Sequence, residues 1–404
     1  MIDITKIRGE FPILSQKING NNLVYFDNGA TTQKPTSVIE SIKGYYTNEN
    51  SNVHRGAHFL SSLATEKLES TRRAVHKLIN SKHVYEIIFT KGTTDSINLV
   101  ANSFQKFLSK GDEVLISELE HHSNIVPWQL CCEKTGATLK VIPVLPNGEL
   151  NLKQLSSLLN KKTKIVAISH ISNTLGTINP IKKIISQCHS VGAKVLIDGA
   201  QAASHLALDV QEINADFYCF SAHKMYGPTG LGVLYGKEKL LNKMPPYQGG
   251  GEMISDVSFS KTKYAELPYK FEAGTPNIGG IIAFKAAIEF ICKVGLNNIC
   301  LHEKALLKYA TSEILKIKNV KIYGTSNEKS AIISFNINGL HPYDIGLLLD
   351  KMGIAIRTGH HCTQPIMDKF KIPGTARLSL AVYNTKQEID VFILSLKKVI
   401  KMLS

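Results

Sequence analysis

Residues 194–224, KVLIDGAQAASHLALDVQEINADFYCFSAHK, decide the fold class of this chain. Two short apolar runs, VLI and FYCF, each end at a polar residue, Asp198 or Ser221. Apolar runs of this length between turn residues are typical of strands that are buried on both faces of a sheet. Because sites in such sheets lie at the carboxyl ends of the strands, Asp198 and the nearby Lys224 are the first candidate site residues.

The same alternation of helix and strand patterns extends from about residue 60 to residue 240. Residues 59–79, FLSSLATEKLESTRRAVHKLI, have the apolar spacing of a helix. Further strands are expected at YEIIFT, EVLIS, TLKVIPV, KIVAISHI and LGVLYG, mostly with helices between them. The pattern predicts an α/β fold with a large domain whose mostly parallel sheet is covered by helices.

The pattern changes after the Gly- and Pro-rich stretch at residues 248–280. Two long helical patterns are followed by the expected strands KIYG, AIISFNI, IAIRTG and ARLSLAVYN, with a helix at PYDIGLLLDKMG and a closing helix. This order predicts a smaller α+β domain at the C-terminus. We expect an N-terminal segment, residues 1–20, that packs on the small domain, a large domain, residues 21–280, and the small domain, residues 281–404.

The composition is that of a globular protein, with 43% hydrophobic and 20% charged residues. No apolar run reaches membrane-spanning length, and the first residues lack the apolar region of a signal peptide, so we expect no membrane association and a cytoplasmic location. The net charge of +14 invites a nucleic-acid interpretation. Because the lysines are spread over helical patterns instead of forming one cluster, we expect no nucleic-acid partner.

The seven cysteines form no C-x-x-C pair, and their odd number argues against a disulfide framework. No two pairs have the spacing of zinc ligands, so no metal site is expected. Six fall within helical or strand patterns and are interpreted as packing residues: Cys131, Cys132, Cys188, Cys219, Cys292 and Cys300. The seventh, Cys362, lies in RTGHHCTQP, residues 357–365, between the turn residues Gly359 and Pro365. This stretch alone leaves open a metal ligand, a redox thiol, a buried residue or a nucleophile.

Lys224 and Asp198 together indicate a specific chemistry that neither residue indicates alone. A lone lysine after a buried strand often reaches solvent through its flexible stem, and an aspartate at a strand end often caps the next helix. Pyridoxal phosphate, however, needs both an amine for its aldehyde and a carboxylate that keeps its pyridine nitrogen protonated. Side chains at two neighbouring strand ends satisfy both needs.

Residues 90–98, TKGTTDSIN, predict a site for the phosphate group. The turn from strand to helix offers free N–H groups, the helix dipole and the hydroxyl groups of Thr93 and Thr94. Ser221 and His223 would reach the same phosphate.

Residues 120–124, EHHSN, follow the strand EVLIS and contain His121 and His122. A flat imidazole there can stack on a cofactor ring. Each of these signs is weak alone, because short Gly-Thr-Thr turns and histidine pairs arise by chance. Their order on successive strand ends is much more specific.

Together these motifs resemble a known family, the group II (SUF-type) cysteine desulfurases and selenocysteine lyases. These are class V aminotransferases and fold-type I pyridoxal phosphate enzymes. The resemblance covers the whole chain through FPIL, YFDNGATTQKP, SNVHRGAH, TKGTTDSINLVA, EHHSNIVPWQ, SNTLGT, DGAQ, SAHKMYGPTG, FEAGTPN, RTGHHC and ARLSLAVYNT.

The resemblance implies roles around the cofactor ring. Lys224 would hold the cofactor covalently, Asp198 would pair with the pyridine nitrogen, and Gln201 would bind the ring hydroxyl. His121 would stack on the ring and help to move protons.

The resemblance also implies the phosphate ligands and a homodimer. Thr93, Thr94, Ser221 and His223 would hold the phosphate. Thr275 of FEAGTPN would join them from the other subunit.

For the substrate, the resemblance implies that Arg377 binds the carboxylate of L-cysteine with Asn173 nearby. Cys362 would be the nucleophile that removes the sulfur as a persulfide and leaves L-alanine, for use in iron–sulfur cluster assembly. His360 and His361 are candidates for lowering the pKa of the thiol.

The short RTGHHC loop limits how far Cys362 can carry sulfur, so an acceptor protein is expected to come to the site. Relatives that use a zinc-dependent, SufU-like acceptor have HPHD before this loop, whereas this chain has HPYD, with Tyr343. The difference favours a SufE-like acceptor.

Two alternatives remain. The same cofactor could support a selenocysteine lyase, a cysteine sulfinate desulfinase or a class V transaminase. A basic scaffold or nucleic-acid-associated protein with a degenerate enzyme fold is disfavoured, because the residues that the cofactor and the substrate need are all present.

Overall fold

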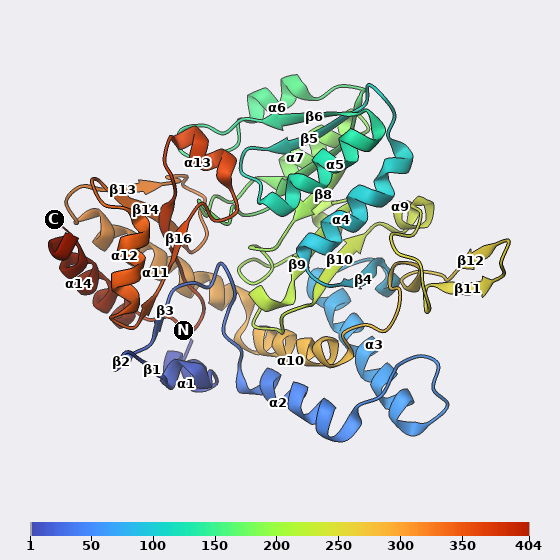
Figure 1. Cartoon of the computed structure of the whole chain (residues 1–404), viewed down its shortest axis with the longest axis horizontal. Coiled ribbons are helices and arrows are strands. Elements are labelled where there is room, and N and C mark those ends of the chain that lie inside the picture. The colour runs from blue at the N-terminus through green and yellow to red at the C-terminus, as the bar shows by residue number, and fades with distance from the viewer. Residues whose placement is uncertain (1, 404) are drawn as a thin grey trace.

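The computed structural model describes residues 2–403, and Figure 1 shows a larger and a smaller part. The sheet of the larger part has seven strands in the order β4-β10-β9-β8-β7-β5-β6. Within it, β10 pairs antiparallel with both neighbours, and the other neighbouring strands pair in parallel. The strands are β4 (Ile87–Thr90), β5 (Glu113–Ser117), β6 (Thr138–Ile142), β7 (Thr163–Ser169), β8 (Lys194–Asp198), β9 (Phe217–Ser221) and β10 (Gly232–Gly236). The prediction of an α/β fold with a mostly parallel sheet is confirmed.

The two faces of this sheet pack into separate cores, which explains the nearly continuous apolar runs. In β8, Val195 and Ile197 join one cluster, and Leu196 joins another. Successive side chains of a strand point to opposite faces, so each face needs apolar residues of its own. The helices of this part are α3 (Phe59–Ile79), α4 (Thr93–Phe104), α5 (Val126–Thr135), α6 (Leu152–Leu158), α7 (Ile181–Ser190), α8 (Val210–Ile213) and α9 (Glu238–Lys243).

The smaller part has an antiparallel sheet in the order β13-β14-β17-β16 and a core of its own. The expected strand IAIRTG is two strands, of which only the second belongs to this sheet. A short helix, α13, follows the loop that carries Cys362 and was not predicted. The elements are β13 (Val320–Tyr323), β14 (Ile332–Ile337), β15 (Ile354–Ala355), β16 (Arg357–Gly359), β17 (Thr375–Ser379), α11 (Leu296–Leu315), α12 (Pro342–Asp350), α13 (Gln364–Phe370) and α14 (Lys386–Leu403).

The first residues of the chain join the two parts. Arg8 donates to the carbonyl of Tyr383 and forms a 2.8 Å ion pair with Glu388. The strand β3 pairs in parallel with β15. The elements here are α1 (Ile4–Gly9), β1 (Lys17–Ile18), β2 (Asn21–Asn22), β3 (Val24–Tyr25) and α2 (Thr36–Gly44).

The helix α10 (Ile278–Val294) packs against α3 of the larger part and against α2. It therefore lies with the larger part although it begins near the expected boundary. The division at residues 20 and 280 stays a prediction.

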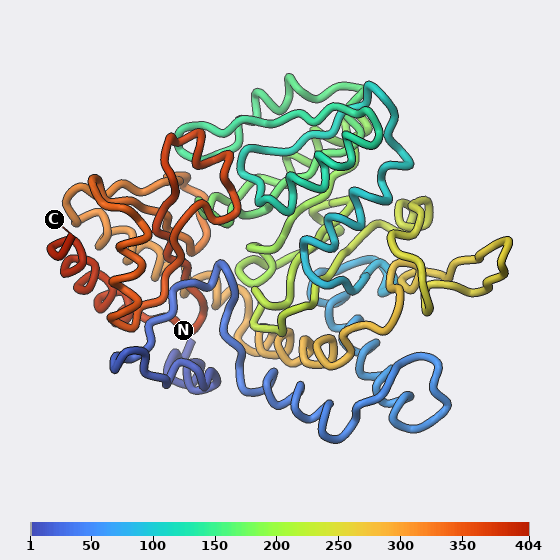
Figure 2. The backbone as a smooth tube through the Cα atoms, in the orientation of Figure 1, coloured from blue at the N-terminus to red at the C-terminus, as the bar shows by residue number. Residues whose placement is uncertain are grey.

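The Gly- and Pro-rich stretch contains a hairpin, β11 (Ile254–Val257) and β12 (Thr262–Tyr264), which was not predicted. Figure 2 shows it projecting from the body of the molecule. Its side chains Val257 and Phe259 are exposed. No helix within residues 2–403 is long and apolar enough to cross a membrane.

The interpretation of six cysteines as packing residues is wrong for one of them. Four are buried and Cys300 is partly buried, but Cys292 is exposed on α10. A helix pattern shows that a residue is helical, whereas the exposure of its side chain depends on which face the neighbours cover.

Candidate active site

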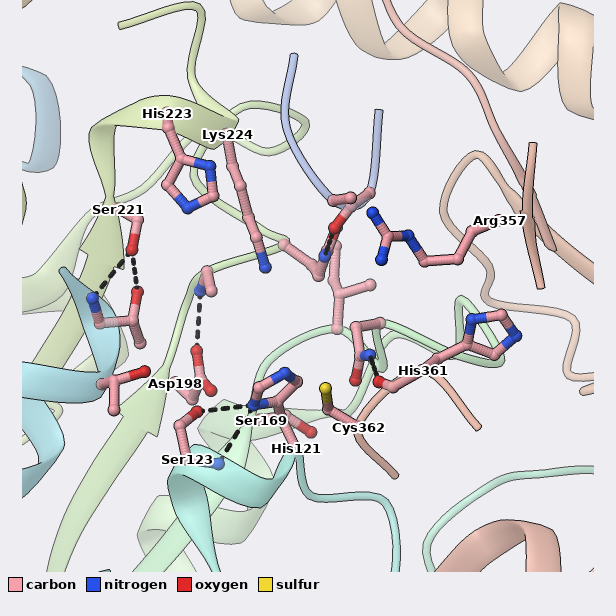
Figure 3. Close-up of a pocket in the computed structure, with 18 of the residues that line it drawn as sticks. His121, Ser123, Ser169, Asp198, Ser221, His223, Lys224, Arg357, His361 and Cys362 are labelled. Carbon is pink, nitrogen blue, oxygen red and sulfur yellow. Dashed lines mark hydrogen bonds between the residues drawn. The ribbon is translucent and has the colours of Figure 1, made fainter. Parts of the chain in front are cut away.

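A pocket opens at the carboxyl edge of the larger sheet, where the two parts of the molecule meet (Figure 3). All but one of the predicted site residues line it: Thr93, Thr94, His121, Asn173, Asp198, Gln201, Ser221, His223, Lys224, Cys362 and Arg377. The exception, Thr275, is exposed and does not line the pocket of its own chain.

Lys224 and Asp198 face the pocket from the ends of neighbouring strands. Lys224 ends the short 3-10 helix η6 (Ala222–Lys224) that follows β9, and its Nζ makes no hydrogen bond or ion pair with residues 2–403. Burial lowers the pKa of Lys224 to about 8, against the opposing effect of Asp198. Oδ1 of Asp198 accepts the N–H of Ala200 at 2.9 Å. Burial raises the pKa of this carboxyl, so a cationic N–H group in the pocket would stabilise its charged form.

The phosphate cradle predicted at the start of α4 is present. The N–H of Thr93 donates to Ser221 Oγ at 2.8 Å, and the two hydroxyl oxygens are 2.7 Å apart. A Cβ at Gly232 would lie 2.5 Å from the backbone of Gly92, so glycine there lets β10 run directly against this turn. The first N–H groups of the helix, together with the exposed Thr94, can bind an anion.

His121 is held in one tautomer. Its Nδ1 accepts the backbone N–H of Ser123 at 3.1 Å and lies 2.8 Å from Ser123 Oγ. Because a backbone N–H can only donate, the proton of the ring is on Nε2. Burial, with a smaller contribution from Lys224, lowers the pKa of His121 to about 3. His121 is therefore neutral near pH 7 and keeps a donor at Nε2.

Arg377, on β17, is 2% exposed. Its Nη1 donates to the carbonyl of Asn173 at 2.8 Å, its Nη2 lies 3.4 Å from Asp27, and its Nε has no partner within residues 2–403. Burial lowers the pKa of Arg377 to about 10, so it stays charged near pH 7. A Cβ at Gly29 would lie 3.1 Å from Nη2, which explains why this loop carries a glycine. A buried guanidinium with an unused N–H suits a carboxylate ligand.

Cys362 enters the pocket on the exposed loop between β16 and α13. The side-chain amide of Asn173 donates to the carbonyl of His361 at 2.8 Å, so this predicted substrate residue also binds the loop. His361 is buried, and burial, together with Arg377, lowers its pKa to about 2. A neutral His361 cannot supply the positive charge expected to lower the pKa of the thiol. The hypothesis is wrong for His361.

The sequence interpretation missed several residues of the site. Arg357 lines the pocket and forms a 2.9 Å ion pair with Asp27. The loop after β3 also supports the turn of Lys224, because Thr32 donates its N–H to the carbonyl of His223 at 3.1 Å and Lys34 Nζ lies 2.9 Å from the same oxygen. The sequence signal for this role is the run of small and polar residues in DNGATTQK, residues 27–34.

Known proteins resemble this chain over its full length. The model of the family Aminotransferase class-V matches residues 24–392. A cysteine desulfurase of Wigglesworthia glossinidia brevipalpis is 51% identical over 403 residues, which cover 99% of this chain and 98% of that protein.

Two solved structures have the same fold. An apo cysteine desulfurase of Thermococcus onnurineus NA1 has a TM-score of 0.94 and 38% identity, covering 100% of this chain and 99% of the other. The cysteine desulfurase CsdA of Escherichia coli, in an S-sulfonic acid form, has a TM-score of 0.93 and 35% identity, with full coverage of both chains. The chain therefore belongs to the aminotransferase class-V family of pyridoxal phosphate enzymes, among relatives that are cysteine desulfurases.

Proposed function

We propose that this chain is a pyridoxal-phosphate-dependent cysteine desulfurase that converts L-cysteine to L-alanine and retains the sulfur on Cys362. One observation carries the proposal. The exposed thiol of Cys362, from the smaller sheet, lines the same pocket as Lys224 and Asp198, from the larger sheet. A cofactor site and a soft nucleophile thus share one cavity.

The residues of the pocket fit pyridoxal phosphate. Asp198 would bind the pyridine nitrogen, and Gln201 would bind the ring hydroxyl. The turn at Thr93, with Ser221 and His223, would hold the phosphate. When bound, this cofactor withdraws electrons from the α-carbon of the substrate, so that the proton there can leave.

The chain supplies orientation and proton transfer. Arg377 would bind the substrate carboxylate, because its buried guanidinium has an N–H without a partner within residues 2–403. Lys224 would take the proton from the α-carbon and return it, and its lowered pKa suits that exchange near neutral pH. Neutral His121 would offer its Nε2–H to the reacting groups.

Cys362 would complete the reaction. Its thiolate sulfur attacks the sulfur of the substrate, so that an S–S bond forms and the Cβ–S bond breaks. The electron pair of the broken bond stays on Cβ, which takes up a proton. The balance is one enzyme thiol and one L-cysteine converted to one persulfide and one L-alanine. The persulfide sulfur would supply iron–sulfur cluster assembly.

A homodimer is part of the proposal. Thr275 is exposed and lies outside the pocket of its own chain, which supports its expected place at the phosphate of the other subunit. Exposed apolar side chains on the hairpin, among them Phe259, support a protein contact there.

The persulfide would pass to an acceptor protein. The exposed Cys362 lies on a loop of few residues, so the acceptor must approach the pocket. Tyr343, 61% exposed, offers no imidazole for zinc exchange, which supports a SufE-like acceptor over a SufU-like one. The seven free cysteines support a reducing compartment, the cytoplasm.

The test is an absorbance spectrum with assays of alanine and sulfide, on the wild type and on Cys362→Ala given L-cysteine and a thiol reductant. We expect both proteins to be yellow and only the wild type to release sulfide. Full activity of Cys362→Ala would contradict the mechanism. Alanine formation from selenocysteine by the same variant would identify a second, selenocysteine lyase activity.

A further inference from the structure

The loop that carries Cys362 has an unfavourable backbone conformation. His361 has φ 52° and Cys362 has φ 55°, so two consecutive residues other than glycine lie in the left-handed region. This region crowds the Cβ of an L-residue, and runs of such residues persist only where surrounding contacts fix them. The contacts that hold this loop therefore determine where the thiol lies.

His122 contacts the backbone of the loop on both sides of the Cys362 side chain. Its N–H donates to the carbonyl of Cys362 at 2.8 Å. Its ring nitrogen Nε2 accepts the N–H of Gln364 at 3.1 Å. His122 begins the short helix η5 (His122–Asn124) of the larger part, so these bonds join the two parts of the molecule across the pocket.

A second imidazole supports the loop from within. His360 Nδ1 accepts the N–H of Cys362 at 3.0 Å, and the rings of His360 and His122 are 5.6 Å apart. Both rings accept a backbone N–H, which can only donate, so both contacts need a ring nitrogen without a proton. The groups that face His122 are His360, the ring of His121 at 6.3 Å and the loop of Cys362. Burial and His360 lower the pKa of His122, which favours the neutral ring.

We propose that His122 is a positioning residue for the sulfur transfer, which holds the left-handed loop so that the Cys362 thiol faces the substrate. The inference rests on the proposed role of Cys362 as nucleophile. His121, which faces the cofactor site, precedes His122 directly. One turn of the chain therefore carries both the ring expected to stack on the cofactor and the residue that holds the loop of Cys362.

The test compares His122→Phe, which keeps a ring but no acceptor, with His122→Gln, whose amide oxygen can reach the place of Nε2. For His122→Phe we expect kcat for sulfide release to fall at least about tenfold, while KM for L-cysteine and the cofactor spectrum change little. His122→Gln should recover most of the loss. His122→Ala replaces the phenylalanine variant if the latter does not retain the cofactor.

Two further readouts separate positioning from general damage. Hydrogen exchange at residues 360–364 should be faster in His122→Phe than in the wild type, with or without the cofactor. Alkylation of Cys362 by iodoacetamide should stay within about threefold of the wild-type rate, because the thiol is already exposed. The exposed Cys292 on α10, which does not line the pocket, serves as an internal reference for the reactivity of the reagent and for the folded state of the variant.

The outcomes distinguish this inference from the proposed function. Unchanged kcat and unchanged hydrogen exchange in His122→Phe would overturn the positioning role, even if Cys362→Ala is inactive. Equal losses in His122→Phe and His122→Gln would also overturn it, because the acceptor at Nε2 would then not matter. Full sulfide release by Cys362→Ala would overturn the proposed function itself.

Discussion

The two halves of the pocket are built by different means. Asp198 ends β8 and Lys224 follows β9, and both strands are interior strands that pair with neighbours on both sides. Cys362 follows β16, which is an edge strand of the smaller sheet, and its loop depends on side chains from across the pocket. The register of a sheet fixes the first half, whereas a few contacts between the two parts fix the second.

The difference matches the chemistry that each half would perform. The proton transfer at the α-carbon needs a buried lysine at a constant distance from the ring, and an interior strand provides it. The sulfur must leave for another protein, so its carrier needs an exposed place on a loop. Substitutions in the sheet half should therefore stop all chemistry, and substitutions in the loop half should stop only the sulfur transfer.

The largest expected effect is that of Lys224→Ala. Loss of the amine removes the proton transfer at the α-carbon, so alanine formation should fall by at least about a thousandfold. Exchange of the α-proton of L-cysteine in D₂O, followed by NMR, should fall with it. In Cys362→Ala the exchange should continue while sulfide release stops. Exchange of the α-proton at the wild-type rate in Lys224→Ala would contradict the assignment of proton transfer to Lys224 and of sulfur transfer to Cys362.

Arg377→Lys should have the next largest effect. A lysine has one charged nitrogen and cannot reproduce the paired N–H groups of the guanidinium, so kcat/KM for L-cysteine should fall about 10- to 100-fold, mainly through KM. Arg357→Lys serves as the matched variant, because Arg357 is 47% exposed and already paired with Asp27. Its effect should be smaller. A larger loss in Arg357→Lys would assign the binding of the substrate carboxylate to Arg357 instead.

Ser221→Ala should weaken retention of the cofactor more than it slows the reaction. The hydroxyl accepts the N–H of Thr93, and its loss removes one hydrogen bond at the phosphate cradle. We expect the dissociation constant of pyridoxal phosphate to rise about 3- to 10-fold, measured by dialysis and absorbance. An unchanged dissociation constant would show that the cradle depends on the helix N-terminus alone.

The sheet half could be predicted from the sequence because its information is local. A buried strand appears as a short apolar run, and the carboxyl ends of parallel strands meet at one edge. This rule alone predicts that Asp198 and Lys224 lie close together at one edge of the sheet. The resemblance to the family added Arg377, on β17 of the smaller sheet, and the role of Cys362, on the loop after β16.

The loop half depends on contacts between distant segments, which no local pattern shows. The left-handed conformation of Cys362, the bonds from His122 and the pairing of Asp27 with Arg357 join residues far apart in the chain. The neutral state of His361 depends on burial, which the histidine pair in RTGHHC does not show. For the same reason the hairpin of residues 254–264 and the exposed Cys292 were missed.

Two buried glutamates at opposite ends of β5, Glu120 and Glu113, differ in the direction in which their pKa values are shifted. Glu120 is fully buried after β5, where Ser117 lies 2.5 Å from Oε1 and Asn124 donates to Oε2 at 2.7 Å. The indole N–H of Trp128 donates to the amide oxygen of Asn124 at 3.0 Å, so the amide nitrogen must face Glu120. Burial raises the pKa of Glu120 to about 8, which favours a neutral acid near the cofactor site.

Glu113, the first residue of β5, has a pKa shifted in the opposite direction. Burial raises the pKa of Glu113, but the hydrogen bonds from Lys140 and Asn160, together with the positive charges of Lys140 and Lys162, outweigh burial and lower it overall. Its charged form therefore stabilises the fold at neutral pH.

The two carboxyls should give stability differences of opposite sign with pH. In the folded chain the pKa of Glu120 is about 8, above its ordinary value of 4.5, so Glu120 binds its proton more tightly there than in the unfolded chain. Its contribution to the free energy of unfolding is therefore complete below pH 4.5 and is lost as pH rises through about 8. Glu120→Gln stays uncharged, so its Tm relative to the wild type should increase from pH 5 to pH 9. Glu113→Gln should lower Tm at pH 7 and approach the wild type in acid, because the contribution of Glu113 is lost as pH falls. Thermal unfolding of the proteins from about pH 3 to about pH 9 measures both differences. Parallel curves for Glu120→Gln and the wild type would show that Glu120 is charged in the folded protein.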